Sequence, residues 1–172
     1  MLKLIGCLMI IYASFMTGHA IGQYHMRMVR ELEEILMFIR RLKGQIAYAA
    51  AELPELLEEC EKQMNGAVGE WLHRLTCRLE ERSEIPFAEL WSDSMADLES
   101  LSALKKDVIA DVDRLGRILG NMDVEAQISQ IELVENILND RYERERERSS
   151  RTNRLANYLG VLGGVFIVIM LV

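Results

Sequence analysis

Two terminal hydrophobic stretches constrain the fold of this 172-residue chain more than any other feature. Leu4–Met26 and Leu155–Val172 contain no Lys, Arg, Asp or Glu, and every charged residue except Lys3 lies between them. A membrane-spanning helix needs about 20 mainly apolar residues, with a range of roughly 17–25. We therefore expect transmembrane helices over residues 4–26 and 155–172, and one domain between them at residues 27–154.

Basic residues gather on the inner side of both stretches, and such residues stay cytoplasmic next to membrane spans. We therefore expect a cytoplasmic central domain, both termini outside the cell, and contacts between the basic flanks and anionic lipid headgroups. These residues are Arg27, Arg30, Arg40, Arg41 and Lys43 after the first stretch, and Arg141, Arg144, Arg146, Arg148, Arg151 and Arg154 before the second.

The first stretch also resembles a signal peptide, because an apolar run follows Lys3 and Gly-His-Ala at residues 18–20 fits a small-x-small cleavage site. A lipoprotein-like box ends at Cys7, but too few residues precede it for an apolar core. The stretch continues to Met26, and Arg27 and Arg30 follow at once. Basic residues directly after a cleavage site hinder export, whereas basic residues directly after a membrane span anchor it. We therefore favour an uncleaved span.

Both stretches contain glycines four residues apart, Gly18 with Gly22 and Gly160 with Gly164. Small residues at this spacing let helices pack closely in lipid. One interpretation is that the spans pair with each other or with partner spans, including those of a homo-oligomer. The alternative is that glycine is simply common in membrane helices.

The charge between the stretches is strongly uneven. Residues 46–139 carry 20 acidic against 8 basic residues, a net charge of −12, although the whole chain has a formal charge of only −7. Nucleic-acid binding needs a basic surface, so this acidic middle argues against it. An acidic surface is compatible with exposure to solvent or with binding of a basic protein partner.

Apolar spacing predicts helices throughout the central domain. A stripe with steps of three and four residues indicates an amphipathic helix that continues from the first stretch. Pro54 suits the first turn of a second helix, which Asn65 and Gly66 end. The stripe residues are Leu32, Ile35, Ile39, Leu42, Ile46, Ala49 and Leu53.

Three further helices are expected over Val68–Leu79, Phe87–Leu98 and Leu104–Leu119, with Gly120 as the stop signal of the last. Asp123 is a natural N-cap for a final helix that continues into the second stretch. The sequence thus predicts an all-α, membrane-anchored bundle of about six helices, with a transmembrane helix at each end continuous with the first and last bundle helices.

No arrangement of residues indicates catalysis, and we expect no cofactor and no metal. His73 is expected on a helix surface, and His19 in an anchoring role near the membrane interface rather than as a buried proton site. Glu58, Glu59 and Glu61 are expected to be a solvated face rather than a cation site. Trp71 and Trp91 are core anchors or, alternatively, exposed hot spots for a partner.

The cysteines are Cys7, Cys60 and Cys77, and their spacing fits neither a zinc site nor a disulfide framework. Reduced, partly buried thiols are expected, because a Cys60–Cys77 bridge would need an oxidising compartment.

Several segments resemble the stage III sporulation protein AB family of endospore-forming bacteria. The resemblance covers essentially the whole chain, including both hydrophobic stretches. Its most specific part is Leu119–Gln127, where Leu-Gly and Asp are followed by Gln. This chain departs from the family at Ala51-Glu52-Leu53, where Thr-Pro-Leu is usual. The matching segments are Met1–Gly6, Leu42–Tyr48, Trp91, Leu115–Gln127 and the glycine-rich final stretch.

The resemblance implies a role in mother-cell sporulation, in a transport complex that joins the mother cell to the engulfed forespore. Family members have a helical domain similar to that of the inner-membrane platform protein of type II secretion and type IV pilus systems. By this analogy the chain is a structural platform that couples a cytoplasmic secretion-type ATPase to envelope components. Other stage III sporulation proteins would be its partners.

The turn before the last helix has two interpretations. It is a cap that connects two helices, or an epitope for a partner made by Gly120, Asp123 and Gln127. A competing function is a two-span receptor or adaptor with a helical sensor domain, which the position of the basic flanks opposes.

Overall fold

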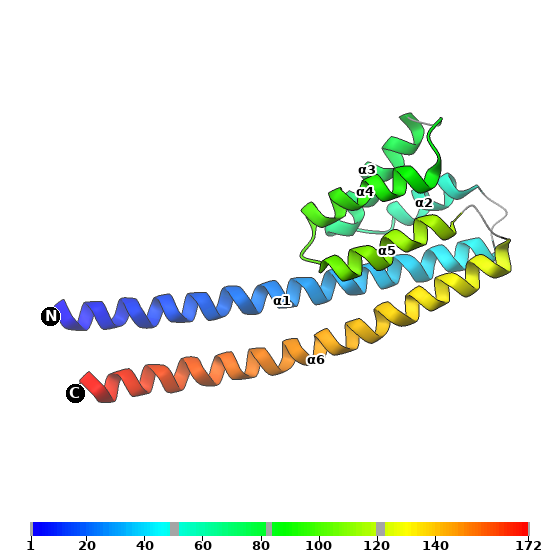
Figure 1. Ribbon diagram of the computed structural model, residues 1–172. Coiled ribbons are helices and arrows are strands. Elements are labelled where there is room, and N and C mark those ends of the chain that lie inside the picture. Colours follow the sequence, from blue (N-terminus) through cyan, green and yellow to red (C-terminus); the bar gives the residue numbers. More distant parts are fainter. Residues whose placement is uncertain (1, 49–51, 82–83, 120–122, 172) are drawn as a thin grey trace. The chain divides into compact units, whose positions relative to one another are not determined.

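The computed structural model describes the backbone of residues 2–48, 52–81, 84–119 and 123–171, and the side chains of residues 16, 23–48, 52–81, 84–119 and 123–149. All regular elements in these ranges are helices (Figure 1). They are α1 (Leu2–Tyr48), α2 (Leu53–Glu61), α3 (Gly66–Glu81), α4 (Phe87–Leu101), α5 (Lys106–Ile118) and α6 (Val124–Leu171). The predicted all-α class and the six helices are confirmed.

The chain divides into two compact units. Unit 1 contains both chain ends, Met1–Val29 and Glu143–Val172, and unit 2 contains Arg30–Tyr142. In unit 1 the first part of α1 and the last part of α6 meet, and the two termini lie at the same end (Figure 1). Unit 2 holds the remaining parts of both long helices together with the whole of α2 to α5.

The predicted stripe of α1 forms its buried face in unit 2. Leu32, Ile35, Ile39, Leu42 and Ile46 are each at most 9% exposed. The face is wider than predicted, because its neighbours Leu36 and Phe38 are also buried. A stripe that reaches beyond a narrow seam is typical of a helix covered by several neighbours rather than by one.

Two details at helix ends differ from the sequence prediction. α1 ends at Tyr48 and Leu53 begins α2, so Leu53 does not continue the first helix. Pro54 is the physical reason, because its ring clashes with the preceding helical turn and is tolerated only at a helix start. Leu104 is buried as expected, but it precedes α5, which begins at Lys106.

An aromatic cluster fills the centre of unit 2. The rings of Trp71 on α3 and Trp91 on α4 meet edge to face at 5.3 Å between centroids, and Phe38 on α1 meets Trp71 in the same way at 5.8 Å. Both tryptophans are fully buried, which confirms that they anchor the core and excludes the exposed alternative. Such edge-to-face pairs add about 0.5–1.5 kcal/mol beyond their buried area.

Each buried indole N–H has a hydrogen-bond acceptor. Trp71 Nε1 donates to Ser94 Oγ at 3.0 Å, and the Ser94 hydroxyl donates in turn to the backbone carbonyl of Trp91 at 2.6 Å. Trp91 Nε1 donates to the backbone carbonyl of Val112 on α5 at 3.0 Å. Because an unpaired buried donor costs about 1–3 kcal/mol, these bonds fix how α3, α4 and α5 meet.

A search of the described residues finds no helix with both the length and the hydropathy of a membrane span. The backbones of residues 4–26 and 155–171 are helical, but the side chains of residues 1–15, 17–22 and 150–172 lie outside the described ones. The expected membrane anchoring is therefore not confirmed by this search.

Candidate functional site

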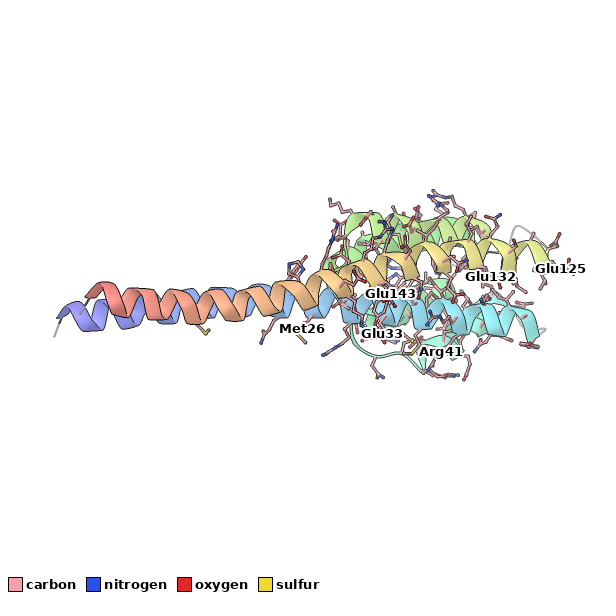
Figure 2. All side chains as sticks on the ribbon, turned by 90° about the horizontal axis from the view of Figure 1, so that it is seen from below. Met26, Glu33, Arg41, Glu125, Glu132 and Glu143 are labelled. Carbon is pink, nitrogen blue, oxygen red and sulfur yellow. The ribbon has the colours of Figure 1, made fainter. Side chains whose placement is uncertain are left out.

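Ion pairs align the two long helices of unit 2 in antiparallel directions. Arg40 Nε lies 2.8 Å from Glu135 Oε1, and Lys43 Nζ lies 2.7 Å from Glu135 Oε2 and 3.5 Å from Glu132 Oε1. Burial alone would raise the pKa of Glu135, but hydrogen bonds from Lys43 and Arg40 hold it below its usual value of 4.5. This register places the C-terminal end of α1 beside the start of α6 (Figure 2).

Asp123 is the N-cap of α6, as predicted. Its Oδ1 accepts the backbone N–H of Ala126 at 2.8 Å, and its carbonyl oxygen accepts the N–H of Gln127 at 2.9 Å. A side-chain acceptor at this position satisfies a donor that the first helical turn otherwise leaves unpaired. Asp123 is exposed and Gln127 is half-buried, whereas Gly120 lies outside the described residues.

The end of α1, the start of α6 beside it and the start of α2, which follows α1 in the sequence, carry exposed apolar and acidic side chains, which we name the end surface. Tyr48 is 94% exposed and Val124 is 52% exposed. The carboxylates around them are exposed, and none forms an ion pair among the described residues. The end surface consists of Tyr48, Glu52, Glu55, Asp123, Val124 and Glu125.

No basic residue occurs in the two sequence segments that form the end surface. Residues 44–61 and 118–140 contain no Lys or Arg, although each contains several Asp or Glu residues. The ends of these segments are close in space because α1 and α6 run antiparallel. The sequence alone predicts an acidic middle of the chain, whereas the fold concentrates part of that charge at one end of unit 2.

Two acids of the predicted carboxylate face, Glu59 and Glu61, have separate partners. Glu59 pairs with Lys62 at 3.7 Å, and Glu61 accepts hydrogen bonds from Thr76 at 2.5 Å and from His73 at 2.8 Å. Burial alone would raise the pKa of Glu61, but these two hydrogen bonds hold it below 4.5. In the part of the chain that the structure describes, no group of His, Cys, Asp and Glu side chains has the arrangement of a metal site.

His73 lies on the outer surface of α3, as predicted, with its side chain 57% exposed. Its Nδ1 faces Glu61, and its Nε2 lies 3.9 Å from the Cys77 sulfur, beyond ordinary hydrogen-bond length. His19, the other histidine considered from sequence, has its side chain outside the described residues.

The described cysteines, Cys60 and Cys77, are free, which rules out the alternative of a bridge between them. Cys60 is buried, and burial raises the pKa of its thiol to about 11. A thiol with so little thiolate at neutral pH is a structural residue rather than a nucleophile.

The glycines predicted to pack membrane helices, Gly18, Gly22, Gly160 and Gly164, lie on helical backbone in unit 1. Their surroundings lie outside the described residues, so their packing stays a prediction.

Sequence reasoning missed the exposed residues of the end surface other than Asp123. The sequence did contain a signal for the exposure of Tyr48. This residue lies two positions after Ile46, which places it roughly 200° around the helix axis from the buried stripe. The exposure of Val124 could not be read from the sequence, because Val124 is an apolar residue at the first position of α6 and no local signal marks it as uncovered.

Comparison with known proteins gives one consistent result. The family model for stage III sporulation protein AB matches residues 3–172. A curated protein of Bacillus subtilis (strain 168) named stage III sporulation protein AB is 22% identical over 171 residues, covering 99% of each chain. A solved structure of a stage III sporulation protein AB superposes with a TM-score of 0.67 at 19% identity, covering 72% of this chain and 97% of that chain.

Proposed function

The chain belongs to the stage III sporulation protein AB family, and from this premise we propose that it is a structural platform in a mother-cell transport complex. The family supports a role in sporulation and interaction with other stage III sporulation proteins. The finer proposal is that the platform couples a cytoplasmic secretion-type ATPase to envelope components during development of the engulfed forespore.

The observation that carries this proposal is the grouping of both chain ends in unit 1. The two uncharged stretches belong to these ends, and each continues as one helix into unit 2. We propose that both stretches cross the same membrane, over residues 4–26 and 155–172, with residues 27–154 in the mother-cell cytoplasm and both termini outside. Two helical connections to one membrane would limit the orientations of unit 2, and a platform needs a limited orientation.

The basic flanks and the glycine pairs fit the same proposal. Exposed Arg30 and Arg148 lie near the ends of the stretches, where each Lys or Arg adds about 1 kcal/mol of attraction to an anionic membrane surface. Gly18, Gly22, Gly160 and Gly164 would allow close packing of the two spans, or of spans from two copies of the chain.

The contact with a protein partner is proposed at the start of α6. Asp123 is exposed there and Gln127 follows one helical turn later, while Gly120, the third residue of the proposed epitope, lies outside the described residues. An acidic surface attracts a basic partner mainly by accelerating association.

Crosslinking of the full chain in sporulating cells tests this proposal. An affinity-tagged copy should recover a sibling stage III protein and a secretion-type ATPase after membrane-permeable crosslinking. Protease added outside intact protoplasts should leave residues 27–154 uncut, whereas cleavage after permeabilisation should remove them. Recovery of neither class of partner, or cleavage of the central region from outside, contradicts the platform.

A further inference from the structure

We propose that the end surface binds an arginine-containing basic segment of a protein partner, with an arginine side chain stacked on the ring of Tyr48. This inference rests on the proposed function, because it identifies the chemistry of the partner that meets the start of α6. It extends the predicted epitope from one helix start to three helix ends.

The position of Tyr48 is the first argument. Ile46 ends the buried face of α1, and Tyr48 points away from that face with 94% of its surface exposed. An aromatic ring left in water contributes nothing to the core of unit 2. Tyrosine is enriched in the buried centres of protein interfaces, where its ring fills a contact and its hydroxyl stays hydrogen-bonded.

The charge around Tyr48 is the second argument. Glu52 and Glu55 follow Tyr48 closely in the sequence, at the start of α2, and Asp123 and Glu125 belong to the start of α6, which lies beside the end of α1. These four carboxylates have no cationic partner among the described residues, whereas Glu135, further along α6, is paired with both Lys43 and Arg40. Asp123 already accepts the N–H of Ala126, so Glu52, Glu55 and Glu125 are the carboxylates of the end surface that remain available to a cationic partner.

An arginine side chain can contact both the exposed ring of Tyr48 and the carboxylates of the end surface. Its planar guanidinium stacks on an aromatic ring and donates paired hydrogen bonds to a carboxylate, which lysine does less well. Pairing between the end surfaces of two copies of this chain is disfavoured, because two surfaces from segments without Lys or Arg would repel each other. The acidic charge excludes nucleic acid in the same way.

Fluorescence anisotropy with the full chain in a neutral detergent tests the inference. The probe is a fluorescein-labelled peptide of alternating arginine and leucine residues, and a lysine–leucine peptide is its counterpart. The first variant is Tyr48→Ala, with Tyr48→Phe as its conservative partner. The second variant combines Glu52→Gln, Glu55→Gln and Glu125→Gln.

A matched control neutralises the same amount of charge elsewhere in unit 2. Glu80, Glu81 and Glu89 are exposed on α3 and α4 and form no ion pair among the described residues. The triple variant Glu80→Gln, Glu81→Gln, Glu89→Gln therefore loses the same net charge and leaves the end surface intact. Circular dichroism of every variant checks that it remains helical.

We expect Tyr48→Ala to weaken binding of the arginine peptide about 3- to 10-fold and Tyr48→Phe to leave it within about twofold. Neutralising the end surface should weaken binding roughly tenfold or more, against less than about threefold for the control. The lysine peptide should bind more weakly and respond less to Tyr48→Ala. Equal losses in both triple variants, or no loss in Tyr48→Ala, overturn the inference.

A photo-crosslinking amino acid at position 48 separates this inference from the platform itself. In sporulating cells it should capture a partner through a peptide that contains arginine. Capture of a second copy of the chain, or of an acidic or apolar segment, overturns the inference and leaves the platform standing. If tagged full-length chain recovers no sporulation protein although the peptide binds as expected, the platform fails and the chemistry of the end surface stands.

Discussion

Gly116 lies directly against the indole ring of Trp91, so close that a β-carbon at this position would overlap the ring. The contact joins α5 to α4 in the centre of unit 2, next to the hydrogen bond from Trp91 Nε1 to Val112. The ring is held by that bond and by neighbouring aromatic rings, so it has little freedom to move aside.

Gly116→Ala should therefore destabilise unit 2 by about 1–3 kcal/mol, the usual cost of overpacking a closely packed core. Gly44→Ala is the matched control, because a β-carbon there meets nothing within 4 Å. Alanine is favoured over glycine in a helix by up to about 1 kcal/mol, so the control should be neutral or stabilising. Thermal unfolding followed by circular dichroism measures both, and equal melting temperatures would contradict the close contact.

Ser94→Ala should cost about 1–3 kcal/mol, because it leaves the buried N–H of Trp71 without its acceptor. Ser92→Ala, at an exposed position of the same helix, should change the free energy of unfolding by less than about 0.5 kcal/mol. Urea titration of intrinsic tryptophan fluorescence reports both values. A loss at Ser92 as large as that at Ser94 would show that the hydroxyl contact contributes nothing specific.

Glu135→Gln should lower stability at neutral pH by about 1–2 kcal/mol, because hydrogen bonds to a charged group become weaker neutral ones. The pKa of Glu135 is lowered in the folded protein, so its stabilisation is complete above its unfolded value near 4.5 and is lost as the pH falls through the lower folded value. The difference between wild type and variant should therefore shrink below about pH 4.5. Unfolding measured from pH 7 to pH 3 checks this, and a constant difference contradicts it.

Asp123→Asn should keep the cap of α6 and change stability by only a few tenths of a kcal/mol, whereas Asp123→Ala should cost about 0.5–2 kcal/mol. The two substitutions separate capping from partner binding, because Asn removes the charge and keeps the acceptor. Pull-down of the proposed ATPase partner with each folded variant is the second measurement. Normal binding by Asp123→Asn would remove this carboxylate from the proposed epitope.

Cys60 should react with N-ethylmaleimide far more slowly than Cys77 in the folded chain. Burial and a pKa of about 11 leave only about one thiol in a thousand ionised at pH 8, while Cys77 is half-buried on α3. Mass spectrometry of tryptic peptides at successive times follows both residues, and denaturation in urea should make their rates similar. Equal rates in the folded protein would contradict the buried position.

The sequence predicted the helices of unit 2 well because their apolar spacing and their end signals agree. Ile35, Ile39 and Leu42 repeat with helical period, and Pro54 and Asp123 have side chains whose chemistry begins a helix. Phe38 was missed, since it lies at the edge of a stripe whose width depends on how many helices cover α1. Periodicity identifies the buried side of a helix and leaves open how far that side extends.

The candidate site was less predictable than the fold. Asp123 was identified through a local signal, its capping chemistry, and the structure confirms the cap. Tyr48 and Glu52 were not identified, because their proximity to the start of α6 depends on the antiparallel pairing of α1 and α6 through Arg40, Lys43 and Glu135.

What the sequence alone determined is everything that depends on neighbours along the chain: the helical class, the helix starts at Pro54 and Asp123, the uncharged ends and the acidic middle. The tertiary structure decided which side chains from distant segments meet, as Trp91 does with Gly116, and which are left exposed, as Tyr48 is. The physical reason is the separation along the sequence over which each interaction acts. Helix formation and capping act within one or two helical turns. Packing and ion pairing join residues separated by tens of positions, and only the folded chain brings those together.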